Sequence, residues 1–301
     1  MVYDIIVVGG GPAGLTAALY ARRAGRSVLV IEKGAFGGQI TFSPKVENIP
    51  GFFSVTGNEF AEKLVGQVLE QGAEVESAEV LSILDGECKT VVTDGGDFVG
   101  RAVIVAAGTR HRLLGLAGEE SFIGNGISFC AVCDGAFYQG QTVGVVGGGN
   151  SALQEALLLS ETSRRVYVIQ DLDHLTGEGQ LQRQLMERSN VELLLGTTVS
   201  AYLGAGELTG VRLYRRSDGH AYDLPLDGLF LAVGLLPQNE PFGSVLPLDA
   251  RGYAAAGEDC LTATPGIFVA GDCRAKAVRQ LTTAAADGAV AALAANSYLG
   301  L

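Results

Sequence analysis

The sequence has few of the features that mark membrane, nucleic-acid-binding or zinc proteins. Its apolar runs, such as residues 103–107, are short and far below the roughly 20 residues of a membrane span. Only 21 Lys and Arg stand against 33 Asp and Glu, giving a net charge of −12, which disfavours nucleic acid and anionic lipid as partners. The three histidines, His111, His174 and His220, lie far from any cysteine pair, so we predict no metal site.

Cysteine is also scarce, and the five cysteines are an odd number. The N-terminal residues show no basic segment followed by a cleavage site, so neither a disulfide framework nor export is indicated. We therefore expect a cytoplasmic protein. Cys88, Cys260 and Cys273 stand alone and are expected to be small buried side chains. Only Cys130 and Cys133 have the spacing of a motif.

An internal repeat is the clearest positive feature. Residues 7–33 and 145–171 align without gaps at an offset of 138, and 12 of the 27 positions are identical. Each copy contains an apolar strand, a glycine turn, a helical pattern and a second apolar strand, which is a βαβ unit. With 301 residues, 48% of them hydrophobic, the chain is predicted to form an α/β protein with two Rossmann-like dinucleotide-binding domains.

The first copy carries a complete dinucleotide fingerprint. Gly9, Gly11 and Gly14 form G-x-G-x-x-G directly after the first strand, and these glycines allow a tight turn, close approach of a pyrophosphate and helix packing. The phosphates would then lie at the helix N-terminus. Glu32 ends the second strand and is placed to accept hydrogen bonds from a ribose.

The second copy is a variant of the same motif. Its turn contains Gly147, Gly149 and Ala152, with Asn150 and Ser151 between them. At the position of Glu32 the repeat has Gln170, followed by Asp171. We assign these residues to a second nucleotide site. The second unit interrupts the first, so the predicted domains are 1–112 with 240–301, and an inserted domain at 113–239.

The pair Cys130 and Cys133 can be half of a zinc site, a redox pair or a chance spacing. Zinc normally requires further Cys or His ligands nearby. Two cysteines three positions apart at a helix start can form a disulfide, and the helix N-terminus lowers a thiol pKa. Asp134 follows directly and can either exchange a proton with a departing thiolate or stabilise the first helical turn.

From end to end the chain resembles low-molecular-weight thioredoxin reductases. The matching stretches are VVGGGPAGLTAALYARRAG, GGQI (37–40), VENIPGF (46–52), ISFCAVCDGAFYQG, VVGGGNSA, GIFVAGDC and RQLTTAAADGAVAA. The resemblance implies an FAD domain built from both chain ends, in the three-layer ββα form, and an inserted domain that carries the cysteine pair.

The same resemblance assigns roles to individual residues. Cys133 would face the flavin, Cys130 would exchange with the substrate disulfide, and Asp134 would donate the proton. Asp272 would meet the ribityl chain. The implied FAD contacts are Gly9, Gly11, Pro12, Ala13, Gly14, Glu32, Lys33, Gly38, Gln39, Asn48, Gly108, Thr109, Gly271, Asp272, Arg279, Gln280 and Leu281. Family members are usually homodimers that reduce thioredoxin, so a homodimer and a thioredoxin-like partner are expected.

The chain departs from this family at the usual NADPH motif. Members that use NADPH carry a His-Arg-Arg stretch after the second strand of the inserted unit, whereas residues 168–179, VIQDLDHLTGEG, contain no Arg or Lys. Asp171 and Asp173 would repel a 2′-phosphate. The sequence therefore disfavours NADPH. It favours a second FAD or no pyridine nucleotide, with NADH next. A ferredoxin donor, which the net negative charge disfavours, and a dithiol oxidase acting on small thiols remain open as alternatives.

Overall fold

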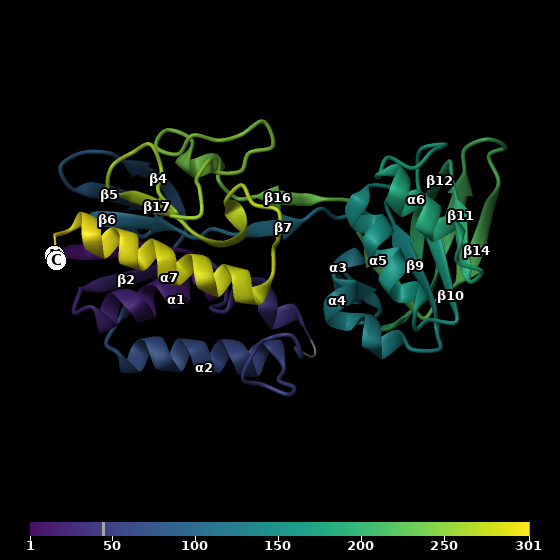
Figure 1. Ribbon diagram of the computed structural model, residues 1–301, viewed down its shortest axis with the longest axis horizontal. Coiled ribbons are helices and arrows are strands. Elements are labelled where there is room, and N and C mark those ends of the chain that lie inside the picture. Colours follow the sequence, from purple (N-terminus) through teal and green to yellow (C-terminus); the bar gives the residue numbers. More distant parts are fainter. Residues whose placement is uncertain (44–45, 301) are drawn as a thin grey trace. The chain divides into compact units, whose positions relative to one another are not determined.

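The computed structural model describes residues 1–43 and 46–300, and the chain forms two compact units. One unit contains Met1–Phe42, Val46–Arg110 and the residues from Leu236 onward, and the other contains His111–Leu235. The connecting segments β7 (Thr109–His111) and β16 (Leu235–Pro237) pair as a two-stranded sheet (Figure 1). The second unit is thus an insertion in the sequence of the first.

The first unit is built on a seven-stranded sheet. Its strands follow the order β3-β2-β1-β6-β5-β4, and β17 also pairs with β6. The strands β1, β2, β3, β6 and β17 are parallel, whereas β5 is antiparallel to its neighbours. The strands are β1 (Val2–Val8), β2 (Val28–Glu32), β3 (Glu74–Ser77), β4 (Val80–Leu84), β5 (Lys89–Thr93), β6 (Gly96–Val105) and β17 (Ile267–Val269), and the helices are α1 (Pro12–Arg23), η1 (Gly38–Phe42), α2 (Gly57–Glu70), η3 (Glu240–Phe242), η4 (Gly271–Cys273) and α7 (Leu281–Tyr298).

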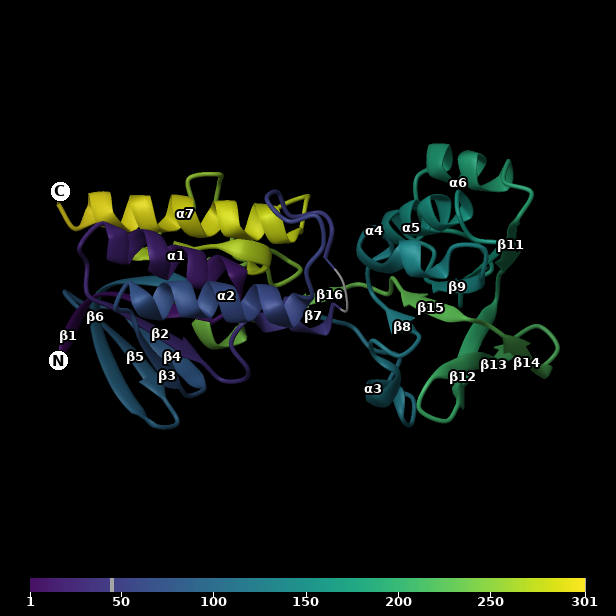
Figure 2. The ribbon, with the colours of Figure 1, turned by 90° about the horizontal axis from the view of Figure 1, so that it is seen from below.

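Both faces of this sheet are covered, which explains why its central strands are apolar throughout. Ile5 and Val7 of β1 join a core formed with α1 and α7. Ile6 and Val8, which alternate with them, join a second core on the opposite face. Figure 2 shows α1 and α7 side by side along the sheet, and the two helices are in direct contact.

The second unit repeats this plan. Its five parallel strands follow the order β11-β10-β9-β15-β8, and β12, β13 and β14 form a separate antiparallel sheet. Val143 and Val145 of β9 pack with α5, whereas Ile169 and Leu229 pack with the antiparallel sheet. The strands are β8 (Ile127–Ser128), β9 (Thr142–Val146), β10 (Arg165–Ile169), β11 (Val191–Leu194), β12 (Thr197–Gly204), β13 (Leu208–Arg215), β14 (Ala221–Pro225) and β15 (Gly228–Leu231), and the helices are α3 (Glu119–Phe122), α4 (Ala131–Asp134), η2 (Gly135–Tyr138), α5 (Asn150–Ser160) and α6 (Gly179–Met186).

Several expectations from the sequence are confirmed at this level. The two repeats form the βαβ units β1-α1-β2 and β9-α5-β10, and the α/β class with Rossmann-like units is confirmed. Cys260 and Cys273 are buried as expected, but Cys88 is only half-buried, because it lies in the turn between β4 and β5. Among the residues described, no helix is long and apolar enough to cross a membrane.

Candidate active site

The first glycine turn joins β1 to α1, and two of its three fingerprint glycines leave no room for a side chain. Gly9 has a φ of 108°, and a Cβ there would collide with the carbonyl oxygen of Ala106. A Cβ on Gly14 would collide in the same way with Gly9. Helix α1 follows Gly11 with Pro12 at its first position, and no side chain caps it. Because no side chain caps this helix, its first N–H groups are able to bind a phosphate.

Glu32 is held beside this turn at the end of β2. Its Oε2 accepts a hydrogen bond from the Gly10 N–H at 2.7 Å, and its Oε1 accepts one from the Gly34 N–H at 2.8 Å. A carboxylate has about four lone-pair sites. The carboxylate of Glu32 is thus oriented and still has capacity for the predicted ribose contact.

Other residues predicted to bind flavin pack directly on the turn. A Cβ on Gly38 would lie 3.1 Å from the Cα of Gly11, so η1 rests against the start of α1. A Cβ on Gly271 would lie 2.8 Å from the Cβ of Ala13, which brings the second predicted flavin motif to the first. The structure therefore joins three segments that are far apart in the sequence.

Further hydrogen bonds connect the remaining predicted residues. The Gln39 side chain donates to the carbonyl oxygen of Thr109, and Asn48 Nδ2 donates to Gln280 Oε1 at 3.2 Å. Gln280 in turn caps α7, which begins at Leu281. The first link joins η1 to Thr109, and the second joins Asn48 to the start of α7, both within the first unit.

Lys33 and Gly108 are less closely tied to this region. The Lys33 ammonium pairs with Glu79 at 3.3 Å, and both side chains are about half exposed. Gly108 has a φ of 67° and accepts a hydrogen bond from the Gln238 N–H at its carbonyl oxygen. Lys33 thus forms an exposed ion pair with Glu79, and Gly108 contributes its carbonyl oxygen to a backbone hydrogen bond just after β6.

Asp272 has the features of a ligand-binding carboxylate. Its Oδ1 is buried without a hydrogen-bond partner among the residues described, and burial raises the pKa of the group, against the opposing effect of Lys276. Arg279 Nε donates to the Asp272 carbonyl oxygen at 3.2 Å. A buried oxygen that lacks a partner is costly unless a ligand supplies one. Asp272 therefore fits a hydroxyl-bearing cofactor such as the ribityl chain of FAD.

Cys130 and Cys133 form a disulfide at the start of α4 in the second unit. Their Cα atoms are 5.3 Å apart and both residues are half-buried. The Cys133 N–H donates to Cys130 Sγ at 3.2 Å, a contact that would also stabilise a thiolate at Cys130. Because the two sulfurs are bonded to each other, the geometry favours the redox interpretation of the pair.

Asp134 is positioned by a residue that the sequence did not single out. Ser128 Oγ donates to Asp134 Oδ2 at 2.6 Å and accepts a hydrogen bond from the Cys130 N–H at 3.1 Å. Asp134 Oδ1 is buried and has no partner in the residues described. Burial raises the pKa of Asp134, and the Ser128 hydroxyl only partly offsets this effect. A carboxyl group in this state holds a proton at higher pH than usual, as a proton donor to a thiolate requires.

The second glycine turn has the same backbone form as the first. Gly147 has a φ of 132°, and a Cβ there would lie 2.6 Å from the carbonyl oxygen of Ala232. Ala152 is fully buried beneath the turn. The loop before α6 lies against this turn, and Asn150 exchanges two hydrogen bonds with Glu178 of that loop. Ser151 stays exposed in the first turn of α5.

Gln170 is buried under this turn, with only 5% of its surface exposed. Its Nε2 donates to the carbonyl oxygen of His174 at 3.4 Å, and a Cβ on Gly148 would lie 2.6 Å from its Cδ. Gln170 thus occupies the position that Glu32 has in the first unit. Asp171, the neighbouring predicted residue, is about half exposed.

A cation that is distant in sequence approaches Asp171. Arg216 Nη2 lies 3.8 Å from Asp171 Oδ2, because the turn between β13 and β14 reaches the end of β10 and the Arg216 N–H donates to the carbonyl oxygen of Gly196. The sequence showed no Lys or Arg between 168 and 179, and it gave no signal for this contact. The acid next to the predicted adenosine-ribose position therefore has an exposed ion-pair partner.

Comparison with known proteins places these features in a family. A family model described as pyridine nucleotide-disulphide oxidoreductase matches residues 3–288. The chain is 41% identical to a thioredoxin reductase of Listeria innocua, covering 99% of this chain and 94% of the relative, and 37% identical to one of Bacillus subtilis, covering 99% and 95%. It is also similar to a crystal structure of thioredoxin reductase from Streptococcus pyogenes, with a TM-score of 0.93, 36% identity and coverage of 99% and 98%.

Proposed function

Since this chain belongs to the pyridine nucleotide-disulphide oxidoreductases, and among them to the low-molecular-weight thioredoxin reductases, we propose that it passes electrons from FAD through Cys130 and Cys133 to thioredoxin or a similar small protein. Membership of this family makes the chain a flavin-dependent disulfide oxidoreductase. The path of the electrons, the roles of the residues and the partner protein are our proposal. The observation that carries it is the disulfide next to half-buried Asp134, whose Oδ1 is buried and has no hydrogen-bond partner among the described residues.

The first unit would hold FAD. Its pyrophosphate would lie at the N-terminus of α1, its adenosine ribose at Glu32, and its ribityl chain at Asp272, with the other residues predicted from the sequence around them. When bound and reduced, the flavin supplies the two electrons that a disulfide needs. The inserted unit would carry the cysteine pair and the second nucleotide site.

The protein residues would handle the protons and the exchange. Reduction of the disulfide takes two electrons and two protons and leaves two thiols. Asp134, protonated at Oδ1, would give one proton to a sulfur as the bond breaks, and solvent would supply the other. Cys130 would then lose its proton to the Asp134 carboxylate and attack the partner's disulfide, forming a mixed disulfide and releasing one partner thiolate, which takes up that proton. Cys133 would attack the mixed disulfide and pass its proton to the leaving sulfur, which restores the Cys130–Cys133 bond and releases the partner as a dithiol.

Trapping tests the assignment of the two cysteines. A Cys133→Ser variant lacks the resolving sulfur, so it should form a stable mixed disulfide with a thioredoxin that keeps only one active-site cysteine, activated as a thionitrobenzoate disulfide. The adduct is visible by non-reducing electrophoresis, and thionitrobenzoate is the leaving group. Cys130→Ser should form far less, and Cys88→Ser should behave as the wild type. A Cys133→Ser variant that still turns over would contradict the proposal, and so would trapping that depends on Cys133 instead of Cys130.

For electron entry we propose a donor other than NADPH. The support is the absence of cations between 168 and 179 and the acid at Asp171, since a 2′-phosphate dianion beside a carboxylate is repelled. The second glycine turn, at Gly147 and Gly149, would hold a second FAD. NADH is our second choice for this site. We further propose, from the family resemblance, a cytoplasmic location and a homodimer.

Two measurements distinguish these donors. The flavin released per chain is quantified, and the oxidised holoprotein is titrated with NADH and with NADPH while the bleaching of flavin absorbance is followed. Two flavins released per chain, with no bleaching by either pyridine nucleotide, would support a second FAD. One flavin with bleaching by NADH would support NADH. Rapid bleaching by NADPH at low concentration would contradict the proposal for the donor and leave the role of the cysteine pair unaffected.

A further inference from the structure

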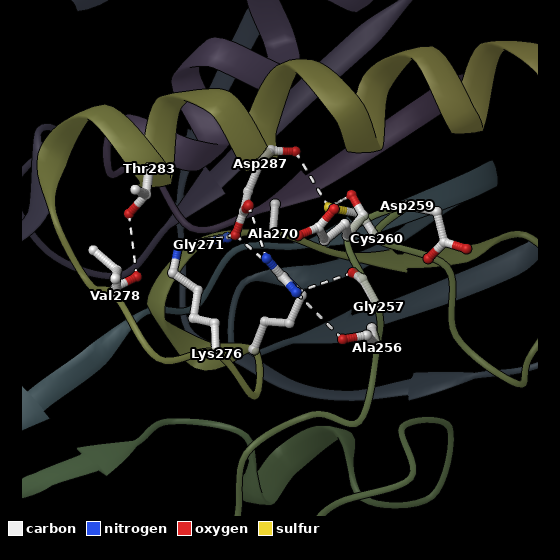
Figure 3. Close-up of polar contacts among 12 residues, drawn as sticks. Ala256, Gly257, Asp259, Cys260, Ala270, Gly271, Lys276, Val278, Thr283 and Asp287 are labelled. Atoms are coloured by element: carbon white, nitrogen blue, oxygen red, sulfur yellow. Dashed lines mark hydrogen bonds and ion pairs between the residues drawn. The ribbon is translucent and has the colours of Figure 1, made fainter.

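An acidic side chain is buried in the middle of the Ala-rich helix α7. Asp287 Oδ2 accepts hydrogen bonds from the Gly271 N–H at 3.0 Å, from Arg274 Nε at 3.2 Å and from Lys276 Nζ at 3.0 Å, and Oδ1 accepts one from Arg274 Nη2 at 2.9 Å. Figure 3 shows the carboxylate of Asp287 directed from the helix toward Gly271 and Lys276. One carboxylate thus collects four donors.

The cluster is an ion network with little solvent around it. The side chains of Asp287, Arg274 and Lys276 are 12%, 9% and 7% exposed. Although burial opposes ionisation of Asp287, the hydrogen bonds from Arg274 and Lys276 hold its pKa below the usual value. Removing one partner from such a network leaves a buried charge uncompensated, which is far more costly than losing a surface ion pair.

Lys276 connects this network to the proposed flavin site. Its Nζ lies between Asp287 and Asp272, 3.7 Å from Asp272 Oδ1. That oxygen is the buried one that lacks a hydrogen-bond partner in the described residues. The charge and the orientation of Asp272 therefore depend on where Asp287 holds Lys276.

Asp287 also lies where the two flavin motifs meet. A Cβ on the next residue, Gly288, would collide with the carbonyl oxygen of Ala13, and a Cβ on Gly271 would lie 2.8 Å from the Cβ of Ala13. Helix α7 and Gly271 thus both pack on the first turn of α1. The hydrogen bond from Gly271 to Asp287 fixes the second motif at this junction.

We infer that Asp287 is a positioning residue for FAD, which anchors Gly271 through its N–H and holds Asp272 in place through Lys276. This inference rests on the proposed binding of FAD at Asp272. Asp287 itself is not one of the cofactor contacts that we assign, because its carboxylate is occupied by Gly271, Arg274 and Lys276. Its effect on the cofactor is therefore indirect.

The rate of FAD release from the holoenzyme tests the inference without relying on activity. After dilution, free flavin is separated by ultrafiltration and measured over time. Asp287→Asn keeps the shape but leaves Arg274 without its anion and Lys276 with Asp272 alone. It should release FAD at least about tenfold faster, the effect of roughly 1.4 kcal/mol. Lys276→Met should release FAD faster by a smaller factor, because Arg274 still holds Asp287. Lys63→Met, in an exposed ion pair on α2, is the matched control and should not change release.

The outcomes separate this inference from the proposed function. Faster release in Asp287→Asn and Lys276→Met supports it. If Asp272→Asn releases FAD faster but these two variants do not, the inference is wrong and the flavin site stands. If Asp272→Asn also has no effect, both are wrong. Should Asp287→Asn fail to fold, Lys276→Met decides, and a lower melting temperature of its apoprotein without faster FAD release would overturn the positioning role.

Discussion

At the scale of single residues, one hydroxyl group organises the cysteine site. Ser128 Oγ binds both the Cys130 N–H and the Asp134 carboxylate, so the proton donor and the first cysteine are fixed to the same side chain. Ser128 is itself buried. The Ser128 hydrogen bond thereby fixes the orientation of the Asp134 carboxyl group, including Oδ1, which has no hydrogen-bond partner among the described residues. This orientation matters because proton transfer depends on hydrogen-bond geometry.

Ser128→Ala should slow disulfide reduction and shift its pH dependence. The Ser128 hydrogen bond lowers the pKa of Asp134 against the effect of burial, so its loss should raise that pKa further. We expect the rate near neutral pH to fall by about tenfold, a fraction of the contribution of a general acid, while the alkaline limb of the pH profile moves to higher pH. Ser121→Ala, on α3 of the same unit, should leave the profile unchanged. A limb that stays in place or moves to lower pH would show that Ser128 does not act on Asp134.

A second buried carboxyl group in the inserted unit makes stability depend on pH. Glu155 Oε2 has no hydrogen-bond partner in the described ranges, and burial raises the pKa of Glu155 from 4.5 to about 7. Because the pKa of Glu155 is higher in the folded protein than in the unfolded chain, its contribution to the free energy of unfolding is complete below pH 4.5. That contribution is lost as the pH rises through about 7.

Glu155→Gln should therefore gain stability relative to the wild type as pH rises from about 5 to about 8, by at most about 3 kcal/mol. Urea unfolding of both proteins at several pH values measures this difference. The exposed Glu207→Gln should show no such trend. A difference between wild type and Glu155→Gln that does not change with pH would mean that Glu155 is solvated in the folded protein.

At the scale of elements, the crossing of α1 and α7 depends on one glycine. A Cβ on Gly288 would collide with the Ala13 carbonyl oxygen and would lie 3.0 Å from the Ala17 backbone nitrogen. Gly288→Ala should destabilise the first unit by about 3 kcal/mol, the upper range for overpacking. By contrast, Gly66 lies in an exposed part of α2 with nothing near its Cβ position, so Gly66→Ala should stabilise by about 0.5–1 kcal/mol. Thermal unfolding of both variants checks the pair, and equal effects would contradict the packing argument.

The turn between β13 and β14 carries Arg216, which allows the preference between NADPH and NADH to be tested. Arg216 is drawn toward Asp171 at 3.8 Å, and replacing the acid would free the guanidinium for a 2′-phosphate, which arginine binds well. Asp171→Ser should improve NADPH binding relative to NADH by about tenfold, or roughly 1.4 kcal/mol, measured by titration calorimetry. The double variant Asp171→Ser/Arg216→Gln should lose most of that gain. An equal gain in the double variant would exclude Arg216 as the phosphate partner.

At the scale of the whole molecule, the sequence predicted the two βαβ units because their signals are local. A glycine turn between an apolar strand and an apolar helix can be read from about 30 residues. Ser128, Arg216 and Asp287 gave no such signal, since each acts through a contact that tertiary structure creates. Ser128 reaches Asp134 across the start of α4, Arg216 arrives from a separate sheet, and Asp287 meets Gly271 from a different element. Local patterns thus locate the ligand-binding turns but miss the side chains that position them.

Anaerobic reductive titration of the oxidised holoprotein tests the central claim, that flavin and the Cys130–Cys133 disulfide exchange electrons. Dithionite is added while flavin absorbance is followed, and the bound flavin is quantified separately. The wild type should take up two electrons per chain beyond those its flavin requires, as expected for one disulfide, and the Cys130→Ser/Cys133→Ser variant should take up only the electrons of the flavin. Equal uptake by the two proteins would contradict the account.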